Sequence, residues 1–112
     1  MNYYLQVNSL IGCPYSIEVE NLLEQNNISN EINKINFEQK NIFKTSQINT
    51  FPQIFLKKYN SNGSILLGGN SDFQEILNLK SKSLETQLQV LSKKYPKLTK
   101  KVKLRIIELF NT

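Results

Sequence analysis

Residues 3–25, YYLQVNSLIGCPYSIEVENLLEQ, contain the strand-to-helix transition on which the fold depends. Residues 3–8 are rich in aromatic and β-branched side chains, a composition that predicts a strand. Gly12 and Pro14 mark a turn, and Pro14 suits the first position of a helix because no backbone N–H donor is needed there. Apolar side chains recur at roughly helical spacing over residues 15–25. The stretch therefore predicts a short strand that leads through a tight turn into an amphipathic helix.

The remainder of residues 1–79 predicts further strands and helices in alternation. We expect a strand near residues 32–37 and then a helix over residues 38–46 with Ile42 and Phe43 buried. A strand over residues 50–59, a hairpin turn at residues 60–63 and a returning strand over residues 64–67 follow. A helix then starts near Phe73, with Ser71 or Asp72 as its cap. This order, β-α-β-α-β-β-α, predicts an α/β fold in which helices flank a central mixed sheet of four strands.

Residues 80–112 form a basic extension beyond these elements. They carry nine Lys and Arg against two Glu, a net charge of +7, whereas residues 1–79 carry five Lys against seven acids, a net charge of −2. Apolar residues recur at helical spacing over residues 84–91 and 98–109, with Tyr95-Pro96 between them. We expect two amphipathic helices here, whose apolar faces pack back on the sheet or form a homodimer.

The residue inventory excludes several kinds of site. A single cysteine and the absence of histidine rule out a Cys/His zinc site and a Cys–His or Ser–His catalytic pair built from this chain alone, so no metal site is expected from its own residues. No run approaches the ~18–20 apolar residues of a membrane span, and no secretory signal is recognisable. A lone, unpaired cysteine fits a reducing compartment, so we expect a cytoplasmic location.

Cys13 lies at the predicted junction of strand and helix. The first N–H groups of a helix lack internal partners, and together with the positive end of the helix dipole they favour a thiolate over a thiol. The thiolate is the attacking species in disulfide exchange. A free cysteine is otherwise often a small buried residue. The flanking Gly12 and Pro14 favour an exposed turn and therefore a reactive sulfur.

Three motifs resemble those of the glutaredoxin family, whose members have the thioredoxin fold. Gly12-Cys13-Pro14-Tyr15-Ser16 resembles the active-site sequence Cys-Pro-Tyr-Cys, with serine in place of the second cysteine. Thr50-Phe51-Pro52 is similar to the family's Thr-Val-Pro, whose proline follows a cis peptide bond. Gly68-Gly69-Asn70-Ser71-Asp72 is similar to its Gly-Gly-x-Ser/Thr-Asp element. The motifs occur in the family's order and near its spacing, so residues 1–79 resemble a glutaredoxin domain of thioredoxin-like fold, followed by the basic extension.

The resemblance implies glutathione as co-substrate and glutathionylated proteins as partners. It assigns Cys13 as the catalytic nucleophile, Tyr15 to the vicinity of the sulfur, Phe51 and Pro52 to the cysteinyl part of glutathione, and Asn70, Ser71 and Asp72 to its γ-glutamyl part, with the Asp72 carboxylate on the ammonium. The remaining motif residues, Gly12, Pro14, Ser16, Thr50, Gly68 and Gly69, support the site. These segments also have plain structural interpretations: Thr50-Phe51-Pro52 as the entry to an edge strand, Gly68-Gly69 as a turn, and Asp72 as a helix cap.

The chain departs from the family pattern at two positions. Leu10 stands where many members carry Lys or Arg, and Lys44 or Gln39 on the expected second helix are candidates for replacement contacts. Because Ser16 replaces the second cysteine, the chain lacks the second thiol that the two-cysteine reduction of protein disulfides needs. The implied mechanism is therefore monothiol: Cys13 takes glutathione from a mixed disulfide, and a second glutathione releases it. Ser16 either donates a hydrogen bond to the sulfur or simply starts the helix.

Two other functions remain open at this point. Single-cysteine glutaredoxins can carry a 2Fe-2S cluster between two subunits, with Cys13 and glutathione sulfurs as ligands, although Pro14-Tyr15 favours the oxidoreductase over the Gly-Phe of dedicated carriers. The basic extension could instead serve as an interaction module for nucleic acid, an acidic protein or an anionic membrane. Nucleic acid is not the expected partner, because the extension lacks the stacking aromatic residues of single-strand binders.

Overall fold

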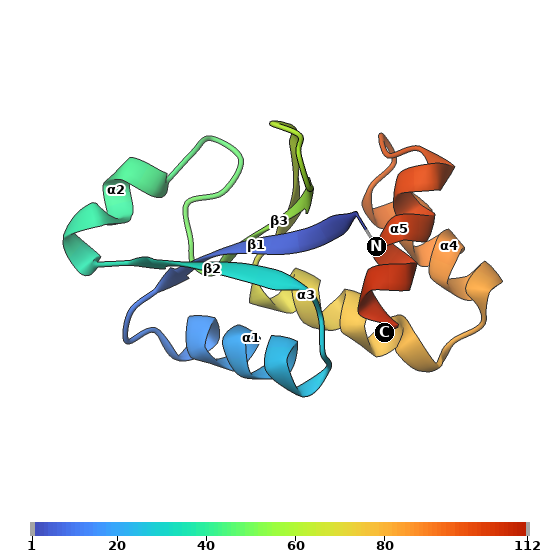
Figure 1. The fold of residues 1–112 in the computed structure, drawn as a ribbon, viewed down its shortest axis with the longest axis horizontal. Coiled ribbons are helices and arrows are strands. Elements are labelled where there is room, and N and C mark those ends of the chain that lie inside the picture. The colour runs from blue at the N-terminus through green and yellow to red at the C-terminus, as the bar shows by residue number, and fades with distance from the viewer. Residues whose placement is uncertain (1, 112) are drawn as a thin grey trace.

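The computed structural model describes residues 2–111, in which four strands form one mixed sheet with helices packed against it (Figure 1). The strands are β1 (Tyr3–Leu10), β2 (Asn30–Ile35), β3 (Gln53–Lys58) and β4 (Ser64–Gly68), in the spatial order β2-β1-β3-β4. β1 is parallel to β2 and antiparallel to β3, and β3 is antiparallel to β4. The predicted α/β fold with a mixed four-stranded sheet is confirmed.

β1 is a central strand, paired on both edges. Leu5, Val7 and Ser9 are completely buried, and the residues between them are only partly buried. This alternation follows from the two-residue period of a strand. The strand runs two residues further than expected, because Ser9 and Leu10 continue the ladder with β2.

Two helices that carry the candidate site lie beside each other on one side of the sheet (Figure 1). α1 spans Pro14–Gln25, with Pro14 at its first turn as predicted, and α3 spans Asn70–Leu77. α3 begins at Asn70, so the expected start near Phe73, capped by Ser71 or Asp72, is wrong. Asp72 lies inside the first turn, and its carboxylate accepts a hydrogen bond from the Gly69 N–H, which stabilises the earlier start.

The segment after β2 differs from the prediction. It contains a 3₁₀-helix η1 (Phe37–Gln39) and one turn of helix, α2 (Lys40–Phe43), instead of a helix over residues 38–46. Phe37 lies outside the strand and is 73% exposed, and Ile42, expected in the core, is 76% exposed. This short turn is mostly exposed, so its apolar positions do not all reach the core. Phe43 is partly buried.

The basic extension folds into η2 (Asn78–Ser81), α4 (Leu84–Lys94) and α5 (Lys100–Phe110). Ser83 and Thr99 cap α4 and α5 by accepting hydrogen bonds from the N–H groups of Thr86 and Val102. Both helices gather at the end of the sheet where β1 begins (Figure 1).

The core is shared between the sheet and the extension. Leu91, Ile106, Leu109 and Phe110 are almost fully buried in the same cluster as Leu5, Val7 and Phe73. The rings of Phe73 and Phe110 lie 5.5 Å apart between centroids. The apolar stripes of α4 and α5 therefore cover the sheet.

None of the helices between residues 2 and 111 combines the length and the apolar character that crossing a bilayer requires.

Candidate functional site

The turn between β1 and α1 presents Cys13. Gly12 has φ +82°, a conformation that side-chain-bearing residues rarely adopt, and Cys13 follows as the residue that caps α1. The Cys13 N–H donates to the Leu10 carbonyl at 3.1 Å, and its own carbonyl accepts from the Ile17 N–H at 3.0 Å. Cys13 is a free, partly exposed thiol. Its sulfur is therefore held at the start of a helix by a defined backbone.

Ser16 has a structural contact within this turn. It is completely buried, and its Oγ accepts a hydrogen bond from the Leu10 N–H at 3.1 Å. Leu10 ends β1, so this bond links the last residue of the strand to the first turn of α1. This contact favours the interpretation of Ser16 as a residue that holds the turn.

A groove of about 640 Å³ opens next to the start of α1. Its lining includes most of the residues that the three motifs singled out: Tyr15, Thr50, Phe51, Gly68, Gly69, Asn70, Ser71 and Asp72. Segments separated by up to 57 positions in the chain thus meet along one groove. Among the motif residues, Gly12, Cys13, Pro14, Ser16 and Pro52 do not line it. Cys13 is placed two residues before Tyr15, at the same helix end.

The groove also contains residues that the sequence analysis missed. Gln47, Ile48, Asn49 and Leu66 line it, whereas Lys44 and Gln39, the candidates for replacement contacts, do not. Gln39 accepts a hydrogen bond from the Asn36 N–H at 3.0 Å and so holds the turn η1. The only signal for residues 47–49 was their position immediately before the Thr50-Phe51-Pro52 motif.

Phe51 forms part of the groove wall, and Pro52 follows it in the chain. The peptide bond between them is cis, as the resemblance implies, and both residues are buried. The next residue, Gln53, is a buried amide whose Nε2 donates to the Phe43 carbonyl at 2.9 Å and whose Oε1 accepts from Asn8 at 3.0 Å. Gln53 therefore ties the start of β3 to both α2 and β1.

The opposite wall is the start of α3, which side-chain hydrogen bonds join to α1. Asn70 Nδ2 donates to the Tyr15 carbonyl and to Glu18 Oε1, both at 2.9 Å. Gln74 Nε2 donates to Glu18 Oε1 and to Asn70 Oδ1, both at 2.6 Å. The side chain of Asn70 therefore links the starts of the two helices.

Asp72 has two partners. Its Oδ2 accepts from the Gly69 N–H at 3.0 Å, and its Oδ1 lies 2.5 Å from Lys94 Nζ. Burial opposes ionisation of the Asp72 carboxyl, but the hydrogen bonds from Lys94 and Gly69 outweigh it and lower its pKa. Burial likewise opposes the charge of Lys94, while Asp72 and Glu75, the latter at 3.0 Å, raise its pKa. The carboxylate assigned to the ligand ammonium already forms an ion pair with the extension.

Tyr95 fixes the end of α4 to the sheet. Its hydroxyl donates to the Leu67 carbonyl of β4 at 2.5 Å. Burial, together with the negative charges of Asp72 and Glu75, raises the pKa of Tyr95, so the hydroxyl keeps its proton and remains a donor. The sequence indicated Lys94 only as one of the basic residues of the extension and Tyr95 only as part of a helix break, and neither was assigned to the site.

Residues 2–111 contain no group of three or more Cys, His, Asp or Glu side chains placed to hold a metal ion.

None of the protein-family models, curated proteins or solved structures compared with this chain matches it.

Proposed function

We propose that this chain has a thioredoxin-like fold and acts as a glutaredoxin-type, glutathione-dependent thiol–disulfide oxidoreductase. The observation that supports this most is the groove beside α1, which collects residues from all three motif segments next to the helix end that bears Cys13. The motifs lie far apart in the chain, so their convergence on one groove is what a peptide-binding site requires.

The proposed chemistry takes place at the Cys13 sulfur. In the first step the Cys13 thiolate attacks the glutathione sulfur of a protein–glutathione disulfide. The S–S bond breaks, the substrate protein leaves as its thiolate, and Cys13 becomes linked to glutathione. A second glutathione thiolate attacks the glutathione sulfur of this adduct, which yields glutathione disulfide and restores the Cys13 thiolate.

Glutathione would be held along the groove. In this proposal the backbone of Phe51 pairs with the cysteinyl part in the manner of an added strand, and the N–H groups at the start of α3 receive the γ-glutamyl carboxylate. Tyr15, 64% exposed, would lie along the peptide. Lys94 already neutralises Asp72, so we assign the ammonium of the ligand to solvent or to a weakened contact with Asp72.

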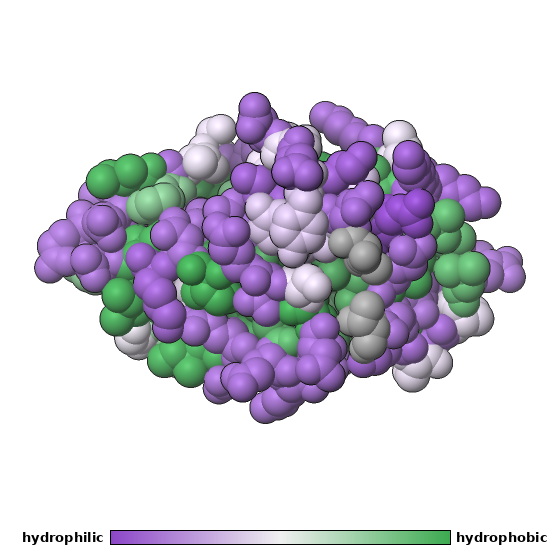
Figure 2. Space-filling view, in the orientation of Figure 1, coloured by the Kyte–Doolittle hydropathy of each residue, from purple (hydrophilic) through white to green (hydrophobic). Residues whose placement is uncertain are grey.

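Apolar side chains near Cys13 suit contact with the protein half of a mixed disulfide. Ile11 and Ile17, two and four positions from Cys13, are 56% and 47% exposed. Figure 2 shows apolar patches among the polar side chains over the end of the molecule that carries α2 and the start of α1. Exposed apolar surface of this kind is common where partners dock.

The direct test compares the wild-type chain with Cys13→Ser. The assay follows glutathione-dependent reduction of a glutathionylated peptide, coupled to glutathione reductase. We expect the variant to fall to the uncatalysed rate while its thermal unfolding temperature stays near that of the wild type. When free glutathione is too scarce for the second step, mass spectrometry should find one glutathione on Cys13 of the wild-type chain. Equal rates for the two proteins would disprove the proposal.

Absorbance after anaerobic purification separates the oxidoreductase from the cluster carrier. An oxidoreductase is colourless, whereas a 2Fe-2S carrier is brown and loses its colour in Cys13→Ser. Binding of an acidic partner that is unaffected by Cys13→Ser, in a chain without reductase activity, would favour the interaction module instead.

A further inference from the structure

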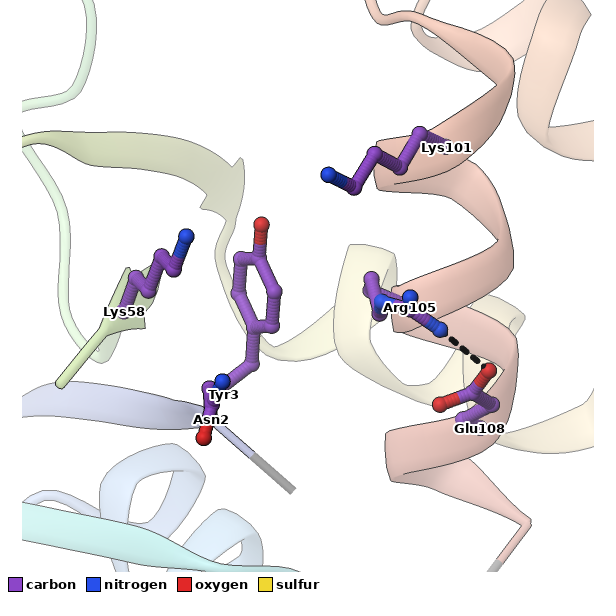
Figure 3. Close-up of a pocket in the computed structure, with 6 residues that line it drawn as sticks. All are labelled: Asn2, Tyr3, Lys58, Lys101, Arg105 and Glu108. Atoms are coloured by element: carbon purple, nitrogen blue, oxygen red, sulfur yellow. Dashed lines mark hydrogen bonds and ion pairs between the residues drawn. The ribbon is translucent and has the colours of Figure 1, made fainter.

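A second, smaller pocket lies at the opposite end of β1 from Cys13 (Figure 3). Its volume is about 290 Å³, and it is lined by Asn2, Tyr3, Lys58, Lys101, Arg105 and Glu108. Tyr3 begins β1, whereas Cys13 follows its end, and at about 3.3 Å per residue the strand separates the two sites by roughly 20 Å or more. The pocket therefore lies outside the groove assigned to glutathione.

The sheet and α5 build this pocket together. Tyr3 and Lys58 stand directly opposite each other in the antiparallel ladder, so their side chains share a face of the sheet. Lys58 Nζ lies 6.0 Å from the centre of the Tyr3 ring. Lys101, Arg105 and Glu108 recur along one face of α5. Because α5 packs on β1, that face lies across from Tyr3.

The charges in the pocket are not balanced. Three cations and one acid give 3 − 1 = +2 at neutral pH. Arg105 Nη1 is paired with Glu108 Oε1 at 2.6 Å, while Lys58 and Lys101 form no ion pair with any residue of the range 2–111. Figure 3 shows the ammonium groups of these two lysines on either side of the Tyr3 hydroxyl. Two unneutralised cations and a hydroxyl donor thus flank one small polar space.

We propose that this pocket binds a phosphate dianion, either inorganic phosphate or the terminal phosphate of a small phosphorylated molecule. The pocket's net charge of +2 complements the charge of about −1.5 to −2 that such a group carries near neutral pH. Lysine ammonium groups and a tyrosine hydroxyl are donors that phosphate oxygens accept. A phosphodiester carries a single negative charge and matches the pocket less well, so the backbone of a nucleic acid is not the assigned ligand.

The binding experiment uses the full chain and isothermal titration at constant ionic strength. The probes are inorganic phosphate, phosphoserine as a monoester, dimethyl phosphate as a diester, and a short single-stranded oligonucleotide. We expect 1:1 saturation by inorganic phosphate or phosphoserine at roughly millimolar concentration, and no saturation by dimethyl phosphate. Comparison of the first two probes distinguishes free phosphate from a phosphorylated molecule.

Variants locate the binding. Lys58→Gln and Lys101→Gln should each weaken it by about tenfold or more, because each removes a charge-assisted contact. Tyr3→Phe keeps the ring and tests the hydroxyl, and Lys101→Arg should retain binding. Lys100→Gln is the matched control: it makes the same charge change on α5, at an exposed residue outside the pocket. Its binding should stay near that of the wild type.

Several results would overturn the proposal. Equal weakening by Lys100→Gln and Lys101→Gln would mean diffuse attraction to a basic helix. Tighter binding of the oligonucleotide or of dimethyl phosphate than of either dianion would exclude the assigned charge state. Failure of both dianions to saturate the wild-type chain would exclude the site. Circular dichroism of every variant separates loss of binding from loss of fold, and the glutaredoxin assay tests Cys13 independently.

Discussion

Lys94, the last residue of α4, holds its ammonium group 2.5 Å from the carboxylate of Asp72 in the first turn of α3. The same ammonium lies 3.0 Å from Glu75. Only 17% of the Lys94 side chain is exposed, against 38% for Asp72. The basic extension thus supplies a cation to the wall of the candidate groove, and this contact connects the stability of the extension to the geometry of the site.

Removing this cation should destabilise the fold. Lys94→Met keeps most of the side-chain volume and leaves Asp72 and Glu75 without their partner. We expect a loss of about 0.5–1.5 kcal/mol in the free energy of unfolding once solvent screening of the partly exposed carboxylates is allowed for. Urea titration at neutral pH measures it. The control is Lys93→Met, an exposed lysine in the same turn, which should stay within about 0.5 kcal/mol of the wild type.

Stability should fall in acid, partly through Asp72. Its pKa is lower in the folded chain, where Lys94 and the Gly69 N–H favour the charged form. The stabilisation is therefore present above the unfolded pKa of about 3.9 and is lost as the pH falls through the lower folded value. Urea midpoints between pH 6 and pH 2 should fall less steeply for Lys94→Met than for the wild type or Lys93→Met. Parallel curves would contradict the linkage.

Tyr95→Phe should weaken the attachment of α4 to β4. The substitution removes the hydrogen bond to the Leu67 carbonyl and costs about 1 kcal/mol. Burial and the charges of Asp72 and Glu75 raise the pKa of Tyr95. The wild type should thus lose stability as the pH rises above about 10, where the unfolded tyrosine ionises, and Tyr95→Phe should lose less. Tyr59→Phe, at an exposed tyrosine, is the control. An equal alkaline loss in both variants would exclude Tyr95 as its source.

Gly68→Ala should disrupt the start of α3. Gly68 has φ +128°, and a Cβ there would run into the Asp72 carboxylate. We expect a loss of about 1–3 kcal/mol and weaker glutathione binding, because the Gly69 N–H and Asp72 would move apart. Gly63→Ala is the matched control, since a Cβ at Gly63 meets only Ser61 Oγ at an ordinary 3.7 Å. Thermal unfolding of the two variants checks this, and equal melting temperatures would contradict it.

The local patterns of the chain were enough to predict much of the fold. Strand-like composition before Gly12, proline at the start of α1 and the turn at residues 60–63 each act over a few neighbouring residues, and the corresponding elements are present. The α/β class follows from their order. The same approach failed for Ile42, because periodicity indicates which face is apolar but not whether anything covers it.

For the candidate site too, some features were readable from the sequence and others only from the folded chain. Cys13, Tyr15, Phe51 and Asp72 were identified from short motifs, since a nucleophile at a helix start and a glycine-rich turn are local features of the chain. These local features did not reveal that the Asp72 carboxylate is already paired with Lys94. Its partner is 22 positions away, and that contact exists only because α4 packs back on the sheet.

Secondary structure, the class of fold and the motif residues were readable from neighbouring residues, because backbone preferences and side-chain periodicity act over short distances. The occupied carboxylate of Asp72 and the cationic pocket formed by Tyr3, Lys58 and Lys101 required the folded chain. Both depend on burial of Leu91, Ile106 and Leu109, which brings the extension against the start of the sheet. Charges distant in the chain become neighbours only when a shared apolar core brings their helices and strands together.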